Sequence, residues 1–104
     1  MHGSSYPVVY TDNAKASLAE LLDFWEAVHG KVKSIEYMLA LQHHLDFLSR
    51  NPFAGRLLER HPHELRQYVA HPTYSIIHEW QAASQTVKVL AFWDNRRNPE
   101  HLRV

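Results

Sequence analysis

Residues 86–93 are apolar on both sides of an extended chain, and this limits how the sequence can fold. One side carries Val87, Val89, Ala91 and Trp93, and the other side carries Leu90 and Phe92. A strand that is apolar on both sides is usually covered on both faces, so this segment is predicted to be a central strand. It runs into Asp94-Asn95-Arg96-Arg97, which predicts two guanidinium groups at a rigid strand end. Such groups suit phosphate or carboxylate capture, although arginine is also common at plain solvated strand ends.

Two amphipathic helices are predicted before this strand. The first begins at Thr11 or Asp12, either of which can cap it, and ends at Gly30. The second covers about residues 32–50 and stops at Asn51-Pro52. Their apolar positions recur at helical spacing and are Ala14, Leu18, Leu21, Leu22, Trp25 and Val28, then Val32, Ile35, Met38, Leu41, Leu45 and Leu48. The short link predicts an antiparallel helical hairpin that packs on a sheet face.

The remaining patterns predict four strands in all. A short β-rich stretch at residues 6–11 precedes the helices, and two alternating stretches at residues 65–70 and 74–81 follow them. One face of these two stretches holds Arg66, Tyr68 and Ala70, then Tyr74, Ile76, His78 and Trp80. Short turns join the last three strands, which predicts an antiparallel meander. Residues 51–64 are expected to be irregular.

The expected fold is therefore α+β, in the order strand-helix-helix-strand-strand-strand. The helical hairpin should lie on one face of a mostly antiparallel four-stranded sheet. Residues 1–104 form one domain, since a chain of 104 residues is close to the commonest domain size. The expected core consists of Leu18, Leu21, Trp25, Ile35, Leu41, Leu45, Leu48, Val89 and Ala91.

Composition narrows the functional classes. The chain has no cysteine, which excludes disulfides and thiolate metal sites and fits the cytoplasm. No apolar run is long enough to cross a bilayer, so no membrane association is expected. Residues 1–49 carry three basic and six acidic side chains, a balance of −3, whereas residues 50–104 carry eight basic and five acidic, a balance of +3. An anionic partner is thus expected at the C-terminal half.

Several landmarks, taken in order, resemble the RelE/ParE superfamily of bacterial type II toxin–antitoxin toxins. They are the hairpin with Ala14, Leu18 and Trp25; Asn51-Pro52-x-x-Gly55; Leu65-Arg66; Tyr74-x-Ile76-Ile77; and Val87-x-Val89-Leu90-x-x-Trp93-x-x-Arg96-Arg97-x-Pro99. They extend over nearly the whole chain. The resemblance implies a growth-inhibiting toxin, associated with plasmid stabilisation, that a cognate antitoxin neutralises in a hetero-oligomer.

The superfamily implies two activities. ParE-like members bind and inhibit DNA gyrase without catalysis, and the Arg96-Arg97 ending resembles theirs. RelE-like members are metal-independent endoribonucleases that cut mRNA on the ribosome, and they need a base, an acid and cations for the phosphorane charge. Arg66 matches the superfamily arginine of the second strand, but no lysine pair precedes it and the C-terminus holds no tyrosine. A net charge of zero also suits ribosomal RNA poorly. The ParE-like reading, a toxin that is not an enzyme, is therefore favoured.

The site predictions follow from these alternatives. The resemblance assigns target binding to Arg66, Arg96 and Arg97. If the chain is a nuclease, its acid–base set must come from Arg66, His71, Tyr74 and His78. A third alternative is a degenerate member that only binds antitoxin.

The sequence has nine histidines, among them the pairs His43-His44 and His61-Pro62-His63. Neither pair is completed by a carboxylate at a recognised metal-binding spacing. No metal and no cofactor are therefore expected. His78 is the histidine of most interest, because it shares a face with Tyr74 near Arg66. It is either a base that works near pH 7 or a histidine at the core edge bonded to the backbone.

Overall fold

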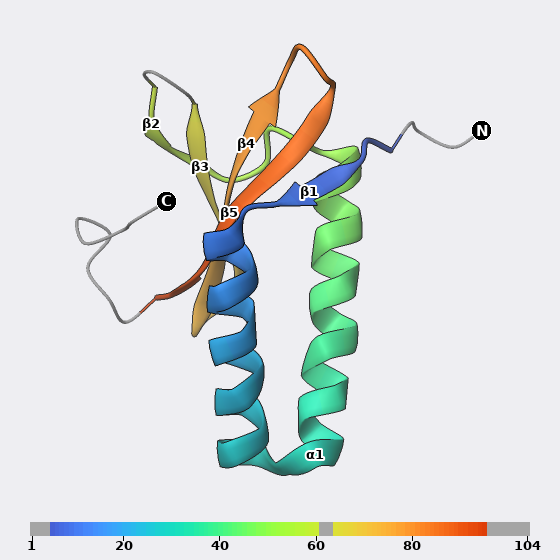
Figure 1. The fold of residues 1–104 in the computed structure, drawn as a ribbon, viewed down its shortest axis with the longest axis vertical. Helices are drawn as coiled ribbons and strands as arrows, with labels where there is room; N and C mark the ends of the chain where they lie inside the picture. Colours follow the sequence, from blue (N-terminus) through green and yellow to red (C-terminus); the bar gives the residue numbers. More distant parts are fainter. Residues whose placement is uncertain (1–4, 61–63, 96–104) are drawn as a thin grey trace.

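The computed structural model describes residues 5–60 and 64–95 (Figure 1). Its elements, in chain order, are β1 (Val8–Tyr10), α1 (Asp12–Arg50), β2 (Arg56–Glu59), β3 (Leu65–His71), β4 (Tyr74–Gln81) and β5 (Thr86–Asp94). The strands form one sheet in the order β1-β5-β4-β3-β2. β1 is parallel to β5, and the three other neighbouring pairs are antiparallel. The chain therefore has the expected α+β, mostly antiparallel architecture.

The predicted count of four strands was wrong, because the segment expected to be irregular contains β2. This strand pairs with β3 through Arg56 opposite Gln67 and Leu57 opposite Arg66. It is four residues long and has two adjacent leucines, so it shows no alternation that would identify a strand. The predicted central strand is β5. It lies inside the sheet between β1 and β4, although β4 occupies the middle position.

The two predicted helices are joined in one helical segment, α1, that reverses direction at Gly30. This residue has φ +84° and ψ 170°, a non-helical conformation that glycine adopts without steric cost. We call residues 12–29 the first arm and residues 31–50 the second arm of α1. Figure 1 shows the two arms side by side and antiparallel, with the end that contains Gly30 extending beyond the sheet. The hairpin was predicted correctly, although the stated order of two separate helices was not.

The start of α1 is fixed to β5. The Thr11 side chain caps the helix by accepting a hydrogen bond from the Ala14 amide at 3.0 Å. β1 ends at Tyr10, so β5 has no strand partner on that edge beyond this point. Side chains of α1 take over the pairing: Asn13 donates to the Leu90 carbonyl at 3.0 Å, and Ser17 accepts from the Phe92 amide at 2.9 Å. The N-terminal turns of α1 thus cover the exposed edge of β5.

The main core lies between α1 and the sheet. It consists of Ala14, Trp25, Leu41, Leu48, Tyr74, Ile76, Val89 and Phe92. A smaller cluster on the other face of the sheet consists of Leu65, Ile77, Leu90, Ala91 and Trp93. Of the predicted core, Trp25, Leu41, Leu48, Val89 and Ala91 are buried, and Leu18, Leu21 and Leu45 are half-buried against the main core. Ile35 is 56% exposed, so that prediction was wrong.

The alternation predicted for β5 breaks at a β-bulge. Ile77 of β4 pairs with Ala91 and His78 pairs with Val89, so Leu90 is an extra residue in β5. Val89 therefore faces α1 whereas Ala91 faces the other side, although the simple alternation put both on one face. The faces predicted for β3 and β4 are observed, since Tyr68, Ala70, Tyr74 and Ile76 all pack toward α1.

Candidate target-binding site

Arg66 is held in the middle of a small cluster on β3. Its Nη1 donates to the Gly55 carbonyl at 3.3 Å, and its Nη2 lies 3.5 Å from a Glu64 carboxylate oxygen. The guanidinium carbon is 5.7 Å from the centre of the Phe53 ring, within reach of a cation–π interaction. The side chain remains 21% exposed. Arg66 can therefore meet a partner while its orientation is already set.

The loop from Asn51 to Gly55 creates this setting, because it passes very close to β3. A Cβ atom on Gly55 would lie 2.6 Å from the Gln67 carbonyl oxygen, and its φ is +102°. Only glycine fits such an approach. The close passage brings the Gly55 carbonyl to Arg66 and the Ala54 carbonyl to His78. The glycine that was a family landmark thus positions two predicted site residues.

His78 lies directly across from Arg66 in the β3–β4 register and is fully buried. Its Nε2 is 2.8 Å from the Ala54 carbonyl, so Nε2 carries the proton and donates. Its Nδ1 is buried without a hydrogen-bond partner among the described residues. Burial lowers the pKa of His78; the bond to Ala54 opposes this shift and the charge of Arg66 reinforces it. The ring is therefore neutral at pH 7, with its only observed bond made to the backbone.

His71 and Tyr74 lie together at the other end of β4, where they are a register pair. Their rings are stacked with centroids 6.0 Å apart. The Nδ1 atom of His71 accepts from the Thr73 amide at 3.2 Å and contacts the Thr73 hydroxyl at 2.9 Å. Burial, and secondarily Tyr68, raises the pKa of Tyr74 to about 12. Its hydroxyl therefore stays protonated at neutral pH.

The four nuclease candidates thus form two pairs rather than one cluster. Arg66 adjoins His78, and His71 adjoins Tyr74. Tyr74 and His78 are four residues apart on β4, a separation of about 13 Å along an extended strand. In each pair one member, His78 or Tyr74, is buried. A single phosphodiester cannot contact all four groups in this arrangement.

An aromatic row beside Arg66 was not predicted. Trp80 packs edge-on against Tyr6 with centroids 4.9 Å apart and against Phe53 at 5.9 Å. Phe53 is 55% exposed. We call Tyr6, Phe53, Arg66 and Trp80 the Arg66 face. The alternation placed Trp80 and Arg66 on the same side of the sheet, but Tyr6 and Phe53 come from loops whose path has no periodic signal.

Arg96 and Arg97 lie outside the described residues, but the residue before them is firmly held. The side-chain Nδ2 of Asn95 donates to the carbonyls of His71 and Pro72, at 3.0 and 3.2 Å. Its side-chain oxygen accepts from the Ser75 hydroxyl at 2.5 Å. The end of β5 is therefore anchored to the sheet at the point where the chain enters the arginine pair.

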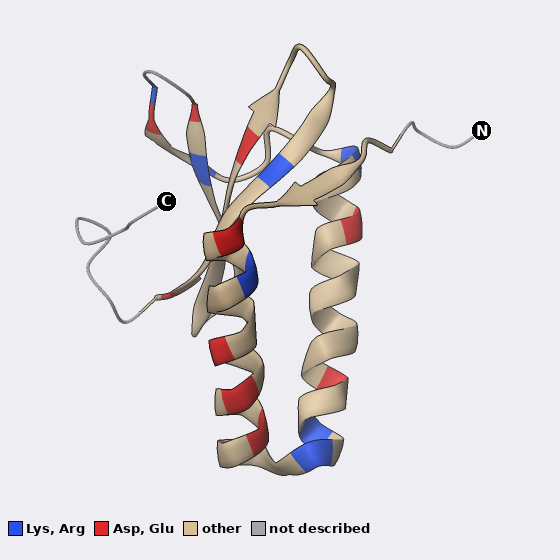
Figure 2. Cartoon of the chain, in the orientation of Figure 1, with Lys and Arg blue, Asp and Glu red and all other residues tan. Residues whose placement is uncertain are grey.

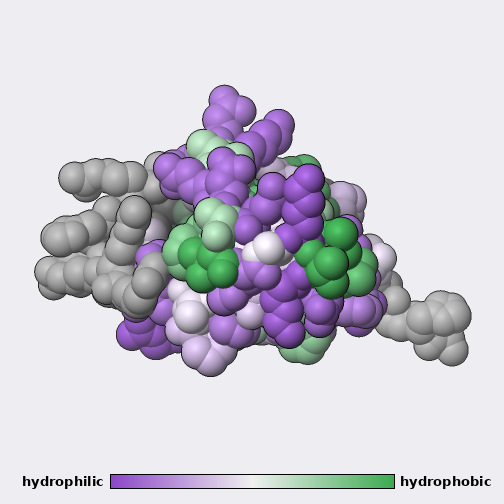
Figure 3. Space-filling view, turned by 90° about the horizontal axis from the view of Figure 1, so that it is seen from below, coloured by the Kyte–Doolittle hydropathy of each residue, from purple (hydrophilic) through white to green (hydrophobic). Residues whose placement is uncertain are grey.

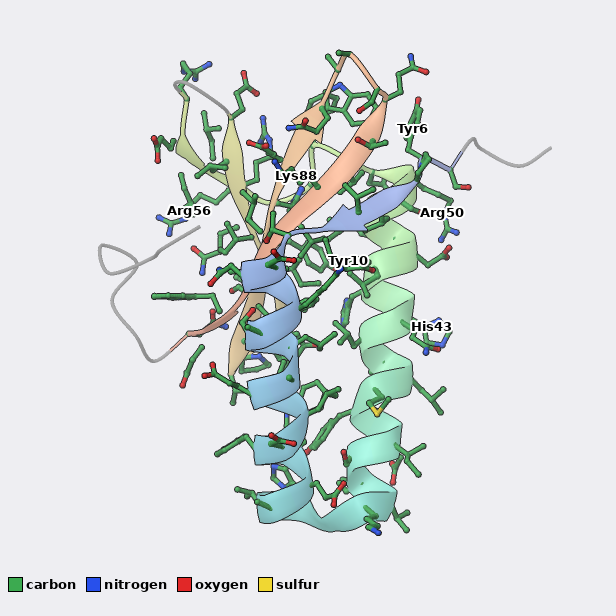
Figure 4. All side chains as sticks on the ribbon, in the orientation of Figure 1. Tyr6, Tyr10, His43, Arg50, Arg56 and Lys88 are labelled. Carbon is green, nitrogen blue, oxygen red and sulfur yellow. The ribbon has the colours of Figure 1, made fainter. Side chains whose placement is uncertain are left out.

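The other described histidines form no metal-binding group. Among residues 5–60 and 64–95, no group of three or more histidine, aspartate or glutamate side chains has a metal-binding arrangement. His44 is bonded to the Tyr68 hydroxyl at 2.9 Å, and burial, His43 and His71 lower its pKa. Figure 4 shows His43 on the outer side of α1, away from the sheet. His61 and His63 lie outside the described residues.

Charge is divided between the helical hairpin and the sheet. Figure 2 shows acidic residues along the first arm of α1 and basic residues at the hairpin end. On the sheet, Arg56 donates to Gln67 at 2.8 Å and Lys88 lies 3.9 Å from Glu79. Figure 4 shows Arg56 at the β2 edge and Lys88 on β5. Among the described residues, basic groups of the sheet are therefore spread over several strands, and the guanidinium group of Arg66 lies over the Phe53 ring.

Comparison with known families matches residues 8–99 to the family described as "ParE toxin of type II toxin-antitoxin system, parDE". The match includes every strand and the whole hairpin. The chain belongs to the ParE toxin family. The expectation of a RelE/ParE-superfamily toxin is thus confirmed, as a type II toxin–antitoxin toxin. A comparison with curated proteins gives no significant match.

Solved structures agree with this assignment at the level of the fold. A chain of the "Chromosomal ParDE TA system from P. aeruginosa" has a TM-score of 0.70 and 17% identity, covering 86% of this ParE-family chain and 96% of its own. The toxin–antitoxin complex RelBE2 of Mycobacterium tuberculosis has a TM-score of 0.56 and 22% identity, covering 88% of this chain and 99% of its own. A "metal-bound toxin from Helicobacter pylori" has a TM-score of 0.64 and 11% identity, covering 88% of this chain and 96% of its own. Separately, none of the helices in the described part of the chain is long and apolar enough to span a membrane.

Proposed function

We propose that this ParE-family toxin acts by binding DNA gyrase, with no proton-transfer step of its own, and that a cognate antitoxin silences it. Membership of the ParE family supports the gyrase branch of the superfamily. The match to the ParE family agrees with the Arg96-Arg97 ending of the sequence, which resembles that of ParE-like members.

The observation that carries the proposal is the state of the possible acid–base groups. His78 is sealed in the core and bonded to a backbone carbonyl, and Tyr74 is buried with a raised pKa. A general base or acid must come within hydrogen-bond reach of the proton that it moves. Neither group can do so without a large opening of the core. A binding surface makes no such demand on them.

The Arg66 face is the proposed contact surface for the target. Tryptophan, tyrosine and arginine dominate binding hot spots, because they combine a large apolar area with a fixed polar group. Here Phe53 is exposed under the Arg66 guanidinium, and Trp80 packs edge-on against Phe53. The proposal also assigns target contacts to Arg96 and Arg97, on the strength of the sequence resemblance; the two residues follow the end of β5 and lie outside the described residues.

The antitoxin is the second proposed partner. The similar structures from P. aeruginosa and M. tuberculosis are described as toxin–antitoxin systems. We propose an acidic antitoxin segment that folds as an amphipathic helix between the hairpin and the sheet edge. Its acidity follows from the balance of +3 in residues 50–104.

The test is a gyrase supercoiling assay with the purified chain, beside primer extension on a message translated in vitro. Inhibited supercoiling with an uncut message is the expected result. Changing Arg96 and Arg97 together to Ala should raise the concentration needed for half-inhibition by about two orders of magnitude or more, because charged hydrogen bonds contribute roughly 1.5–3 kcal/mol each. Codon-phased cuts with unaffected gyrase would contradict the proposal.

A RelE-like nuclease is the alternative, and one contact favours it. Arg66 and His78 are register neighbours, so a cation adjoins an imidazole on one face of the sheet. In that case Arg66→Ala should abolish message cleavage while antitoxin binding persists. A chain that is silent in both assays would be a degenerate member that only binds antitoxin.

A further inference from the structure

The second arm of α1 has two apolar stripes on opposite sides. One stripe, which includes Leu41 and Leu48, is buried in the main core. The other consists of Val32, Ile35 and Leu39, which are 76%, 56% and 54% exposed. Exposure of single apolar residues is ordinary, but a helical stripe of three large ones indicates a surface that meets another molecule. We call Val32, Ile35 and Leu39 the outer seam.

The spacing of the outer seam is that of a coiled coil. The three residues follow one another at intervals of three and four, which are the a and d positions of a heptad. A seam this narrow accepts the ridge of one further helix rather than a sheet or an extended peptide. The occupant should therefore be helical and apolar along one stripe.

The flanking charges identify the occupant. Lys31 precedes the seam at the heptad position g, and Glu36 lies beyond Ile35 at position e. In a parallel pair of helices, g of one helix meets the following e of the other. A second copy would thus bring Lys31 against the Glu36 of the other chain, twice by symmetry. Within the chain, Glu36 lies 3.7 Å from Lys33 in an exposed ion pair. Exposed ion pairs contribute little to stability, so Lys31 of a second copy can replace Lys33 as the partner of Glu36.

The antiparallel arrangement lacks this match. It would set Glu36 opposite Glu36 or His43 and would give Lys31 no acidic partner across the seam. The charge pattern is therefore self-complementary in one orientation only.

The hairpin end is also accessible. Figure 1 shows that it extends beyond the sheet, so the strands do not cover it. Figure 3 looks onto this end and shows hydrophobic side chains exposed on two sides of it, with hydrophilic ones between them. The outer seam belongs to the second arm, and Phe24 and Val28 of the first arm are exposed as well.

We propose that the outer seam is a self-association surface: two copies of the chain pair through the second arms of α1, in parallel, with Lys31 of each copy against Glu36 of the other. The inference is independent of the target of the toxin. The short seam makes the dimer weak and concentration-dependent, since small interfaces belong to transient complexes. The dimer would present two Arg66 faces on one particle.

The first test is sedimentation velocity of the purified chain over a concentration series. A dimer that forms with rising concentration is expected. Ile35→Lys should lower the association constant by at least about tenfold, because it buries an unpaired charge in the seam. Val69→Lys is the matched control, since Val69 is 60% exposed on β3, away from the seam, and should leave association unchanged. Circular dichroism checks that both variants are folded.

The second test mixes two charge variants. Lys31→Glu and Glu36→Lys should each weaken dimerisation through like-charge pairs, yet an equimolar mixture should form heterodimers, because both cross-chain pairs become attractive again. Intrahelical effects of the same substitutions cannot produce this recovery. A wild-type chain that stays monomeric, a dimer that Ile35→Lys leaves intact, or a mixture that fails to recover would each overturn the proposal. Loss of antitoxin binding in Ile35→Lys with a monomeric wild type would assign the seam to the antitoxin instead.

Discussion

At the scale of single residues, two carbonyl groups of one loop organise the candidate site. The Ala54 carbonyl accepts a hydrogen bond from the His78 ring, and the Gly55 carbonyl accepts one from Arg66. The loop reaches them because Gly55 has no side chain where the Gln67 carbonyl lies. The site therefore depends on a backbone approach as much as on the residues that carry charge.

Gly55→Ala tests this dependence. The new Cβ would collide with backbone that cannot move freely, in a φ region that alanine avoids, so the free energy of unfolding should fall by about 1–3 kcal/mol. Gly30→Ala is the control. It has a similar positive φ, but nothing lies within 4 Å of its Cβ position. Urea denaturation should show the larger loss for Gly55→Ala, and equal losses would contradict the account of the loop.

His78→Gln should keep growth inhibition, because the Gln amide can still donate to the Ala54 carbonyl and no proton transfer is assigned to the ring. The variant should also flatten the pH profile of stability. The folded pKa of His78 lies below the unfolded one, so the unfolded chain takes up the proton first as the pH falls. The free energy of unfolding should be steady above about pH 6.5 and fall below it. Loss of toxicity in a folded variant would argue for a catalytic His78.

Much of this residue-scale arrangement could be predicted. Alternation along residues 65–70 and 74–81 put Arg66 and His78 on one face, and the structure makes them register neighbours. Alternation could not show that His78 is sealed, because the lid is the loop at residues 51–55, whose path depends on the close passage of Gly55. The sequence pattern also did not show that the candidates form two separate pairs, Arg66 with His78 and His71 with Tyr74. Sharing one face of a strand does not imply contact, because four residues of extended chain span about 13 Å.

At the scale of elements, the second arm of α1 shows why apolar spacing can mislead. The predicted stripe took Val32 and Ile35 together with Leu41 and Leu48, but the first two belong to the outer seam. Both stripes are apolar, so hydropathy does not distinguish them. Only the position of the sheet, which ends before the hairpin tip, shows which one is buried (Figure 1). The bulge at Leu90 was unpredictable for a similar reason, because an extra residue in an all-apolar strand leaves no mark in the pattern.

Truncation separates the two stripes. Leu48→Ala should lower the free energy of unfolding by about 2–5 kcal/mol, because Leu48 is fully buried in the main core. Ile35→Ala should change it by less than about 0.5 kcal/mol at a protein concentration where the chain is monomeric. Chemical denaturation measures the free energy of unfolding of both variants. A comparable loss in the two would mean that Ile35 is part of the core.

At the scale of the whole molecule, the acidic and basic halves of the chain occupy different parts of the fold. The first arm of α1 carries four acidic residues against one lysine, and the strands carry Arg56, Arg66 and Lys88 (Figure 2). An acidic antitoxin segment would meet the sheet side. Calorimetry should then show an affinity that falls as salt rises, since exposed charge pairs are screened within about 10 Å at 0.1 M salt. An affinity that does not depend on ionic strength would contradict an acidic segment.

Gyrase binding without catalysis is the central claim at this scale, and induction of the toxin in cells tests it most directly. The DNA damage response and the rate of translation are followed separately after induction, with co-induced antitoxin as the control. The account predicts that the damage response rises first, while translation continues until growth slows. An immediate stop of translation with no damage response would contradict it.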